Sequence, residues 1–540
     1  MNARRDHLVG LALCAVYVAV LLHTAPDLGM ARDEGMYVQA AEAYAGWLEL
    51  LWREPKAALD QAAIDQAFRI NREHPPLFKL LFGLGFLAQR AWHPFAYDSS
   101  SYRFAGMLAA GLLLWLIYVF GTRLYGRAAG AFAAAAYALL PRPFYHAHLN
   151  AFDVPITLAN TAVIYAYVRS VEDKRWGYAC GALFGLALLT KHNSWVLPGI
   201  FVIHYLLVAW RERKLRWMVP HALIGCLTIG PVLLFAGWPY LWHDGFERLG
   251  WYVRFHLHHE YYNMEYFGVN YFWPPFPISY AWVMTLFTVP LSTLLMGVVG
   301  TAERLLALPP PRKTPGVWAA DDPKLVTLVL AGALFAPLAQ MSLPSTPIFG
   351  GTKHWFPAYP FLCLFAGSAF TRLLELARER FGERLPERFW RYLPPLAASW
   401  LLAPALVETV HSHPFALSHY TVAAGGVPGA AESGMNRQFW GFTTRSLTPW
   451  LREAMPNGGT VYLCDTIPMA WGMLVRDGFL PENIRPSYDI ARSDYALVHH
   501  EKHFAEIDHQ IWTTYGTVQP AYVLRYDGVP IISVYKNPRR

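Results

Sequence analysis

Long apolar stretches recur through the first 410 residues of the chain and strongly constrain how it can fold. Eleven such stretches lie at residues 8–25, 103–121, 128–141, 154–169, 177–190, 195–210, 219–237, 280–300, 324–341, 356–372 and 392–409. A helix needs about 20 apolar residues to cross a bilayer, and we expect the shorter stretches to extend into their aromatic flanks. The pattern predicts a mainly α, polytopic membrane protein with about 11 transmembrane helices.

The composition supports this interpretation. Only 15% of the 540 residues are charged, whereas soluble domains carry about 25%. The 21 Trp and 30 Tyr residues fit aromatic belts at two membrane interfaces. The five cysteines show no spacing typical of a disulfide framework or of a cysteine-based metal site. The net charge of +7 is explained by basic cytoplasmic loops, so we expect no nucleic-acid partner.

The loops between the stretches alternate in charge, which predicts the topology. Loops rich in Arg and Lys, such as "RERKLRW", occupy every second position and place the N-terminus in the cytoplasm and the C-terminus outside. Residues 76–91 would invert the later loops if they crossed the membrane, so we interpret them as an amphipathic helix on the outer interface. Residues 8–22 could be a signal peptide, but no A-x-A site follows, and we interpret them as an uncleaved span.

The composition changes at about residue 411. The runs "TVYLCD", "YALVHH" and "AYVLRYDGVPIISVYK" have the character of β-strands, and the "DG" in the last run is a hairpin signal. A helical pattern at 467–478 lies between them. We therefore predict a membrane domain over 1–410 and a small α/β extracytoplasmic domain over 411–540.

Three acidic residues stand at the outer ends of predicted spans. Asp33 and Glu34 directly follow the first stretch, and Asp153 begins the fourth. Such residues are common as favourable charges at a helix start or as N-caps, so a purely structural role is open for each. Their shared depth and face also allow a catalytic role.

A second polar segment, "NREHPPLFK" at 71–79, carries Glu73, His74 and Lys79 around a pair of prolines. The prolines fix an extended entry into the interfacial helix. An ordinary loop ended by proline, with a lysine whose ammonium reaches the interface, would show the same pattern. The segment alone leaves both interpretations open.

Taken together, these motifs resemble glycosyltransferase family 39, whose members have the GT-C fold and use polyprenyl-phosphate sugars. The family includes protein O-mannosyltransferases and bacterial aminoarabinose transferases. The resemblance spans residues 10–410 and rests on "RDEG", "EHPPLFK", "FDVP", "LTKHNSWVLP" and "KHWFPAYPF", in this order. The tail segment "AAGGVPGA" also resembles bacterial members.

The resemblance implies roles for individual residues. Asp33 corresponds to the catalytic base, Glu34 to its acidic neighbour, and Asp153 to a second acid near the acceptor site. His74 opens the H-P-P-L-x-K pattern of the mannosyltransferase branch, and Arg103 matches an outward arginine of that branch. The implied reaction is inverting, because one carboxylate base suffices when a phosphate is the leaving group.

A departing lipid phosphate requires cations. The candidates are Arg103, Lys191, Lys353 and His354, together with His74 and Lys79 of the segment 71–79. Charge-assisted hydrogen bonds to phosphate oxygens are the strong kind. Lys191 and Lys353 could equally be lysines that reach the interface from span ends.

No cofactor follows with certainty, although a divalent metal is possible. The loop "FHLHHEYYNMEYFG" at 255–268 offers histidines, and we select Glu73 and His259 as the ligands if a metal binds. The histidine spacing matches no firm zinc pattern, and an aromatic interfacial loop is the alternative.

The sequence thus predicts a multi-pass enzyme of the inner (plasma) membrane with its active site on the extracytoplasmic face. Its partners would be the bilayer, a polyprenyl-phosphate-linked sugar and an acceptor hydroxyl on protein Ser/Thr, a lipid A head group or another envelope glycan. A transporter or flippase of a lipid-linked solute is the alternative, because acids and cations in membrane segments also mark transport pathways. An inactive scaffold whose outer domain binds a partner is a third interpretation.

Overall fold

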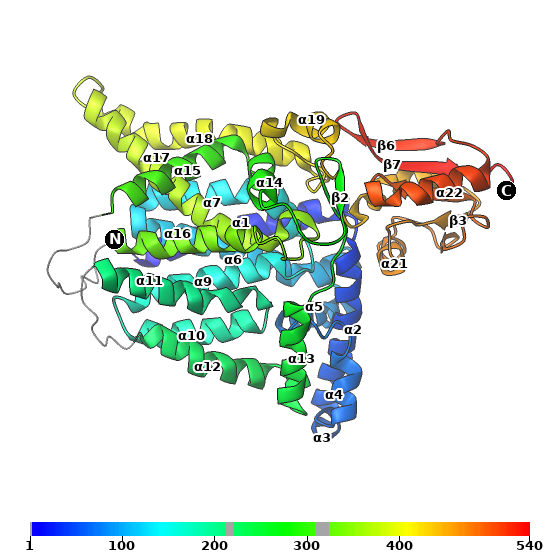
Figure 1. Cartoon of the computed structure of the whole chain (residues 1–540), viewed down its shortest axis with the longest axis horizontal. Helices are drawn as coiled ribbons and strands as arrows, with labels where there is room; N and C mark the ends of the chain where they lie inside the picture. The colour runs from blue at the N-terminus through cyan, green and yellow to red at the C-terminus, as the bar shows by residue number, and fades with distance from the viewer. Residues whose placement is uncertain (1–2, 212–219, 309–322) are drawn as a thin grey trace.

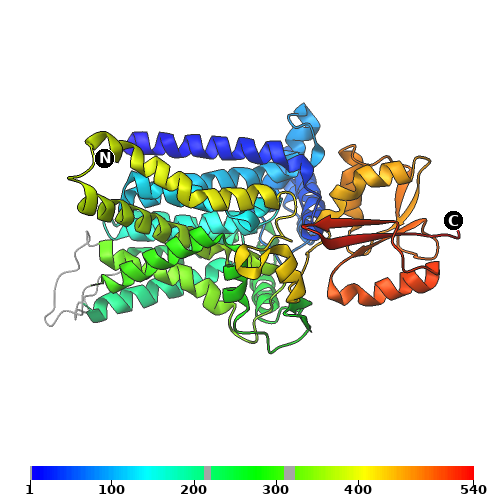
Figure 2. The ribbon, with the colours of Figure 1, turned by 90° about the horizontal axis from the view of Figure 1, so that it is seen from above.

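The computed structural model describes residues 3–211, 220–308 and 323–540. Most of the chain forms a bundle of helices that run side by side, and a sheet with its own helices lies at one end (Figures 1 and 2). The long helices of the bundle are α1 (Ala3–Thr24), α6 (Asp98–Tyr125), α7 (Arg127–Ala138), α9 (Asp153–Ser170), α10 (Arg175–Leu188), α11 (Leu197–Arg211), α12 (His221–Gly237), α15 (Leu291–Leu306), α16 (Pro323–Gln340), α17 (Tyr359–Phe381) and α18 (Glu387–Ser412).

Each of the predicted apolar stretches contains helix in the residues that the structure describes. The stretch at 280–300 is divided between α14 (Tyr280–Thr288) and α15, because Pro290 disfavours helical geometry at Val289, which is extended. In the described part of the chain, five helices are long and apolar enough to cross a membrane, at Arg4–Asp27, Asp98–Tyr125, His192–Trp210, Gly351–Phe381 and Glu387–Ser412. The chain is a multi-pass membrane protein, while the number of spans and their orientation stay predictions.

Small residues let the bundle helices approach closely. A Cβ on Gly181 of α10 would lie 2.3 Å from the backbone carbon of Gly225 in α12. Such contacts between small residues are typical of helices that pack within a membrane. Burial differs between the helices of the bundle. Most of α6 is buried among its neighbours, whereas most of α18 is exposed on the surface of the bundle.

Several helices lie across the end of the bundle that faces the sheet. Figure 1 shows α2 (Arg32–Arg53), α4 (Gln61–Phe68) and α13 (Gly245–Leu257) in this transverse position. Arg248 of α13 pairs with Asp65 of α4 at 2.5 Å and ties two of them together. The predicted interfacial helix is α5 (Leu77–Trp92), which packs on α2 and α6. The remaining short helices are α3 (Pro55–Ala58), α8 (Pro141–Ala147) and α19 (Gly426–Glu432).

The C-terminal part contains a five-stranded mixed sheet, so the predicted α/β character is confirmed. Its strands are β3 (Gly459–Tyr462), β4 (Ile484–Ser487), β5 (Tyr495–His499), β6 (Tyr522–Tyr526) and β7 (Val529–Lys536), in the order β4-β3-β5-β7-β6. Its helices are α20 (Thr448–Ala454), α21 (Pro468–Arg476) and α22 (Ala505–Tyr515). A separate hairpin, β1 (Met264–Tyr266) and β2 (Val269–Tyr271), lies outside this sheet.

Local sequence explains the edges and centre of the sheet. Strand β3 pairs in parallel with β4 and β5, and β7 pairs antiparallel with β5 and β6. Asp527 and Gly528, the predicted hairpin turn, both have positive φ, as a two-residue turn between antiparallel strands requires. All five residues of β5 are buried, as expected for a central strand covered on both faces.

The domain boundary at 410/411 stays a prediction, and α18 ends two residues beyond it at Ser412.

Candidate active site

A cavity of about 640 Å³ lies where the transverse helices, the end of the bundle and the C-terminal part meet. Its walls come from segments that are far apart in the sequence, from the start of α2 to the loop after β5. Seven of the predicted site residues line it: Asp33, Glu73, His74, Lys191, His259, Lys353 and His354. The other four do not line it: Lys79 and Asp153 contact the lining residues His74 and Lys191, and Glu34 and Arg103 contact each other.

Asp33 faces the cavity in an ion pair. It is the second residue of α2, and its Oδ2 accepts a hydrogen bond of 2.9 Å from Lys353 Nζ. The Asp33 side chain is 35% exposed, whereas that of Lys353 is buried. Lys353 also lies 4.1 Å from the ring centroid of Trp440, a favourable position for a cation. The carboxylate is thus held in place yet open to a ligand in the cavity.

Glu34 and Arg103 form a fully buried ion pair. Arg103 Nε and Nη2 each lie 2.9 Å from a different Glu34 oxygen, and both side chains are almost inaccessible. Glu34 also accepts from the backbone N–H of Ala31, and Arg103 donates to the carbonyls of Leu28 and Gly29. The pair therefore fixes the turn before Asp33. Arg103 was predicted as a phosphate ligand, but the structure commits its guanidinium to this turn, away from the cavity.

Asp153 forms a second carboxylate–lysine pair below the cavity wall. It is the first residue of α9, and its Oδ1 accepts from Lys191 Nζ at 2.7 Å. Its other oxygen lies 3.4 Å from His146 Nδ1. Lys191 follows α10 and lines the cavity, so Asp153 acts on the cavity through this lysine. Two lysines held by two carboxylates thus stand at the same site.

The turn at 71–74 is held by Lys79. Its Nζ donates to the carbonyls of Asn71, at 2.6 Å, and His74, at 2.7 Å. Burial lowers the pKa of Lys79 to about 7. The predicted phosphate-binding role of Lys79 does not match this position, because its N–H groups close the turn and do not face the cavity. His74 packs beside Tyr37 and lines the cavity, and burial keeps its pKa well below its ordinary value, so it is neutral.

The predicted metal ligands, Glu73 and His259, both line the cavity but have other partners. Glu73 accepts from the Asn71 side chain, and His259 Nδ1 lies 2.7 Å from the Glu260 carbonyl, which requires that nitrogen to donate. Among the described residues, no group of three or more His, Cys, Asp or Glu side chains is arranged to hold a metal ion. The metal site stays a prediction, and we derive no step through a metal.

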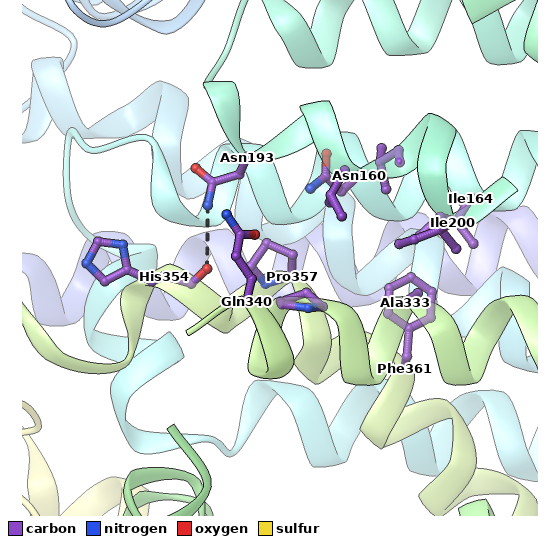
Figure 3. Close-up of a pocket in the computed structure, with 12 residues that line it drawn as sticks. Asn160, Ile164, Asn193, Ile200, Ala333, Gln340, His354, Pro357 and Phe361 are labelled. Atoms are coloured by element: carbon purple, nitrogen blue, oxygen red, sulfur yellow. Dashed lines mark hydrogen bonds between the residues drawn. The ribbon is translucent and has the colours of Figure 1, made fainter. Parts of the chain in front are cut away.

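A small cleft lies next to the cavity on the side of the bundle and shares lining residues with it. Figure 3 shows it between α9, α11, α16 and α17, where Ile164, Ile200, Ala333 and Phe361 line it. Asn193 and His354 border both the cleft and the cavity. The Asn193 side chain donates to the His354 carbonyl at 3.5 Å across the junction. With a volume of about 10 Å³, the cleft has room for about one water molecule.

Sequence reasoning missed several residues of the cavity. His192 and His256 stack at 3.8 Å between ring centroids and line it. His256 Nε2 must donate to the Glu73 carbonyl at 2.8 Å, and burial lowers the pKa of His256 to about 4, so the ring is neutral. Residues of the C-terminal part also line it: Asn436, Phe439, Trp440, Glu501 and His503. No motif identifies the C-terminal residues, because only the packing of that part against the bundle brings them to the cavity.

Comparisons with known proteins agree with this fold. The family model "Dolichyl-phosphate-mannose-protein mannosyltransferase" matches residues 73–238. No curated protein matches the chain. The crystal structure of ArnT from Cupriavidus metallidurans in the apo state is 16% identical, with 97% of each chain covered and a TM-score of 0.49. The archaeal oligosaccharyltransferase AglB from Archaeoglobus fulgidus, in complex with an inhibitory peptide and a dolichol-phosphate, is 10% identical, with 95% of this chain and 71% of that chain covered and a TM-score of 0.50.

The likeness to AglB shows a shared fold, that of the GT-C membrane glycosyltransferases. Within this fold, residues 73–238 are similar to the dolichyl-phosphate-mannose-protein mannosyltransferases. The resemblance that the motifs predicted is thereby confirmed for residues 73–238.

Proposed function

We propose that the chain is an integral membrane glycosyltransferase that moves a sugar from a polyprenyl phosphate to an acceptor hydroxyl. The observation that carries this proposal is the pair of carboxylate–lysine contacts, Asp33–Lys353 and Asp153–Lys191, at one cavity. The cavity provides cations for a phosphate and a carboxylate for a proton. We place it on the outer face of the inner membrane, as the charge pattern of the loops predicts.

The donor phosphate binds between Lys191 and Lys353, beside His354. A phosphate is a strong acceptor for charge-assisted hydrogen bonds and competes with both carboxylates for the lysines. The family match to enzymes that use dolichyl-phosphate-mannose, and the dolichol-phosphate bound by AglB, support a donor of this class.

Asp33 acts as the base. When Lys353 turns to the phosphate, the Asp33 carboxylate becomes free to accept the proton of the acceptor hydroxyl. The acceptor oxygen forms a bond to the anomeric carbon, the bond from that carbon to the phosphate oxygen breaks, and its electron pair leaves with the phosphate. The lysines stabilise the developing charge. A single displacement inverts the anomeric carbon.

Glu34 and Asp153 support this chemistry from behind the wall. Glu34 and Arg103 fix the turn that presents Asp33, so Glu34 is a positioning residue. Asp153 orients Lys191 towards the cavity in the same way. His74, held by Tyr37 and the Lys79 turn, forms a neutral wall beside the base.

The test uses the full chain in liposomes with polyprenyl-phosphate [³H]mannose and a crude envelope fraction as acceptor. We expect a labelled covalent product with inverted configuration, and a decrease of about 10²–10⁴-fold in its formation with Asp33→Asn. Asp60→Asn is the matched control, because Asp60 is an exposed aspartate at the start of α4. Movement of the donor across the membrane with no covalent product would refute the proposal and favour a transporter.

A further inference from the structure

The side chain of Lys353 ends in an enclosure at the cavity wall. Its Nζ donates to Asp33 Oδ2 at 2.9 Å and lies 4.1 Å from the ring centroid of Trp440 and 5.2 Å from that of Phe349. Among the described residues, Asp33 is the only hydrogen-bond partner of this ammonium. The two rings therefore supply much of the remaining stabilisation, because the face of an aromatic ring attracts a cation.

Backbone contacts hold Trp440, a residue of the C-terminal part, beside the catalytic turn. Its carbonyl accepts a hydrogen bond of 3.0 Å from the Arg32 N–H, and its side chain is buried. Trp440 has a φ of 61°, which a bulky residue rarely adopts. Such backbone conformations persist only where the surrounding structure enforces them, and they concentrate at functional sites. The position of the ring is therefore set by the backbone beside Arg32.

The segment before Lys353 leaves room for this ring. Gly350 has a φ of 67°, and a Cβ at this position would lie 2.2 Å from Trp440 Cζ2 and 2.9 Å from Lys353 Cε. A larger residue would therefore separate the ring from the lysine stem. Both the backbone conformation and the space at Gly350 require glycine, and together they allow the lysine and the indole to meet.

The enclosure competes with a phosphate for the ammonium of Lys353. The Lys353 side chain is 5% exposed, so a ligand in the cavity reaches only a small part of its surface. A phosphate that draws the ammonium towards itself must move it away from Asp33 and from the face of the Trp440 ring. The contacts of the enclosure therefore stabilise the lysine at Asp33 and weaken its binding to the phosphate.

We propose that Trp440 is a positioning residue that returns Lys353 to Asp33 and so promotes release of the polyprenyl phosphate. This inference rests on the proposed function, because it requires that Lys353 binds the donor phosphate and that Asp33 takes the proton of the acceptor. Directly after transfer, Asp33 is protonated and attracts the ammonium only weakly, whereas the ring face keeps its attraction. The ring is thus the partner that takes the lysine back before Asp33 is ionised again.

The test replaces Trp440 by tryptophans that carry one, two, three or four fluorine atoms, incorporated at this position alone in the full chain. Fluorine withdraws electrons from the ring face and weakens its attraction for a cation, with little change in shape. The probe is polyprenyl phosphate, and its affinity is measured by calorimetric titration in liposomes. We expect the affinity to rise with each fluorine, by about 2–30-fold in total. Inhibition of sugar transfer by added polyprenyl phosphate should become stronger by the same factor.

Two control series separate this role from a structural one. The same fluorotryptophans at Trp400, an exposed residue of α18, leave the affinity unchanged. In Lys353→Met, fluorine at Trp440 has no effect, because the lysine on which the ring acts is absent. A distortion of the site would still change the phosphate affinity in this background, through Lys191.

The outcomes distinguish the inference from the proposed function. An affinity that stays constant or falls along the Trp440 series overturns the inference but keeps the proposed function. A rise that persists in Lys353→Met also overturns the inference, because the ring then acts on the phosphate without the lysine. If the wild type binds polyprenyl phosphate but transfers no sugar to the envelope fraction, the proposed function fails and the inference fails with it.

Discussion

The buried ion pair between Glu34 and Arg103 fixes the turn before Asp33, and its contribution to stability can be measured. Glu34→Gln keeps the size of the side chain but removes its charge, so the Arg103 guanidinium is left buried without a counter-ion. It also turns an NH2 group towards donors that now contact the carboxylate, which include Arg103 and the Ala31 N–H. Breaking a buried pair by removing one partner costs about 3–5 kcal/mol. We expect a loss of this size in the free energy of unfolding.

The assay is an SDS titration of the purified chain, followed by tryptophan fluorescence. Glu387→Gln is the control, because Glu387 pairs with Arg378 at 2.8 Å while both side chains are exposed, and such pairs contribute about 0–1 kcal/mol. The double variant Glu34→Gln/Arg103→Gln should be more stable than Glu34→Gln alone, since it also removes the unpaired charge. A loss below about 1 kcal/mol in Glu34→Gln would refute the reasoning.

Three further perturbations test other parts of the site. Lys353→Met and Lys191→Met should each weaken binding of polyprenyl phosphate about 10–100-fold in calorimetric titrations, because each removes a charge-assisted hydrogen bond worth about 1.5–3 kcal/mol; unchanged affinity in both variants would contradict the phosphate site. Lys79→Met leaves two buried carbonyls without a donor, which costs about 1–3 kcal/mol each. We therefore expect a lower thermal midpoint of unfolding. An unchanged midpoint would show that Lys79 does not hold the turn. Burial raises the pKa of Asp465 above its ordinary value of 3.8, which stabilises the fold at low pH and ceases to do so as the pH rises through the raised pKa. Relative to Asp465→Asn, the wild type should therefore lose stability as the pH rises from about 4 to about 7, and a constant difference in thermal midpoint across this range would contradict the shift.

Much of the fold follows from hydrophobic pattern. The apolar stretches form helices because an apolar segment in lipid is stable only when its backbone groups are hydrogen-bonded within the segment. The "DG" pair predicted the β6–β7 hairpin, because Asp and Gly tolerate the positive φ that the turn requires. The split at Pro290 was not predicted, since the apolar pattern of 280–300 continues through it.

The site was predictable where a short motif fixes its own geometry. Asp33, His74, Lys191 and Lys353 were selected from three predicted outer loops, and the structure brings all four to one cavity. The role of Arg103 could not be predicted from its position in the sequence, because packing decides which carboxylate pairs with a buried arginine. In the structure this carboxylate is Glu34.

The C-terminal contribution was beyond sequence reasoning. Asn436 and Glu501 stand in no motif, and they reach the cavity only because the sheet packs against the catalytic turn through Arg32. Side chains of this kind depend on contacts between distant segments, which periodicity and propensity do not encode.

The most direct test of Asp33 as the base is a single-turnover measurement with Asp33→Asn, combined with a separate measurement of polyprenyl phosphate affinity. The account predicts a chemical step slower by about 10²–10⁴-fold and tighter binding of the phosphate, because Lys353 loses the carboxylate that competes for it. A rate of sugar transfer equal to that of the wild type, at saturating donor, would contradict it.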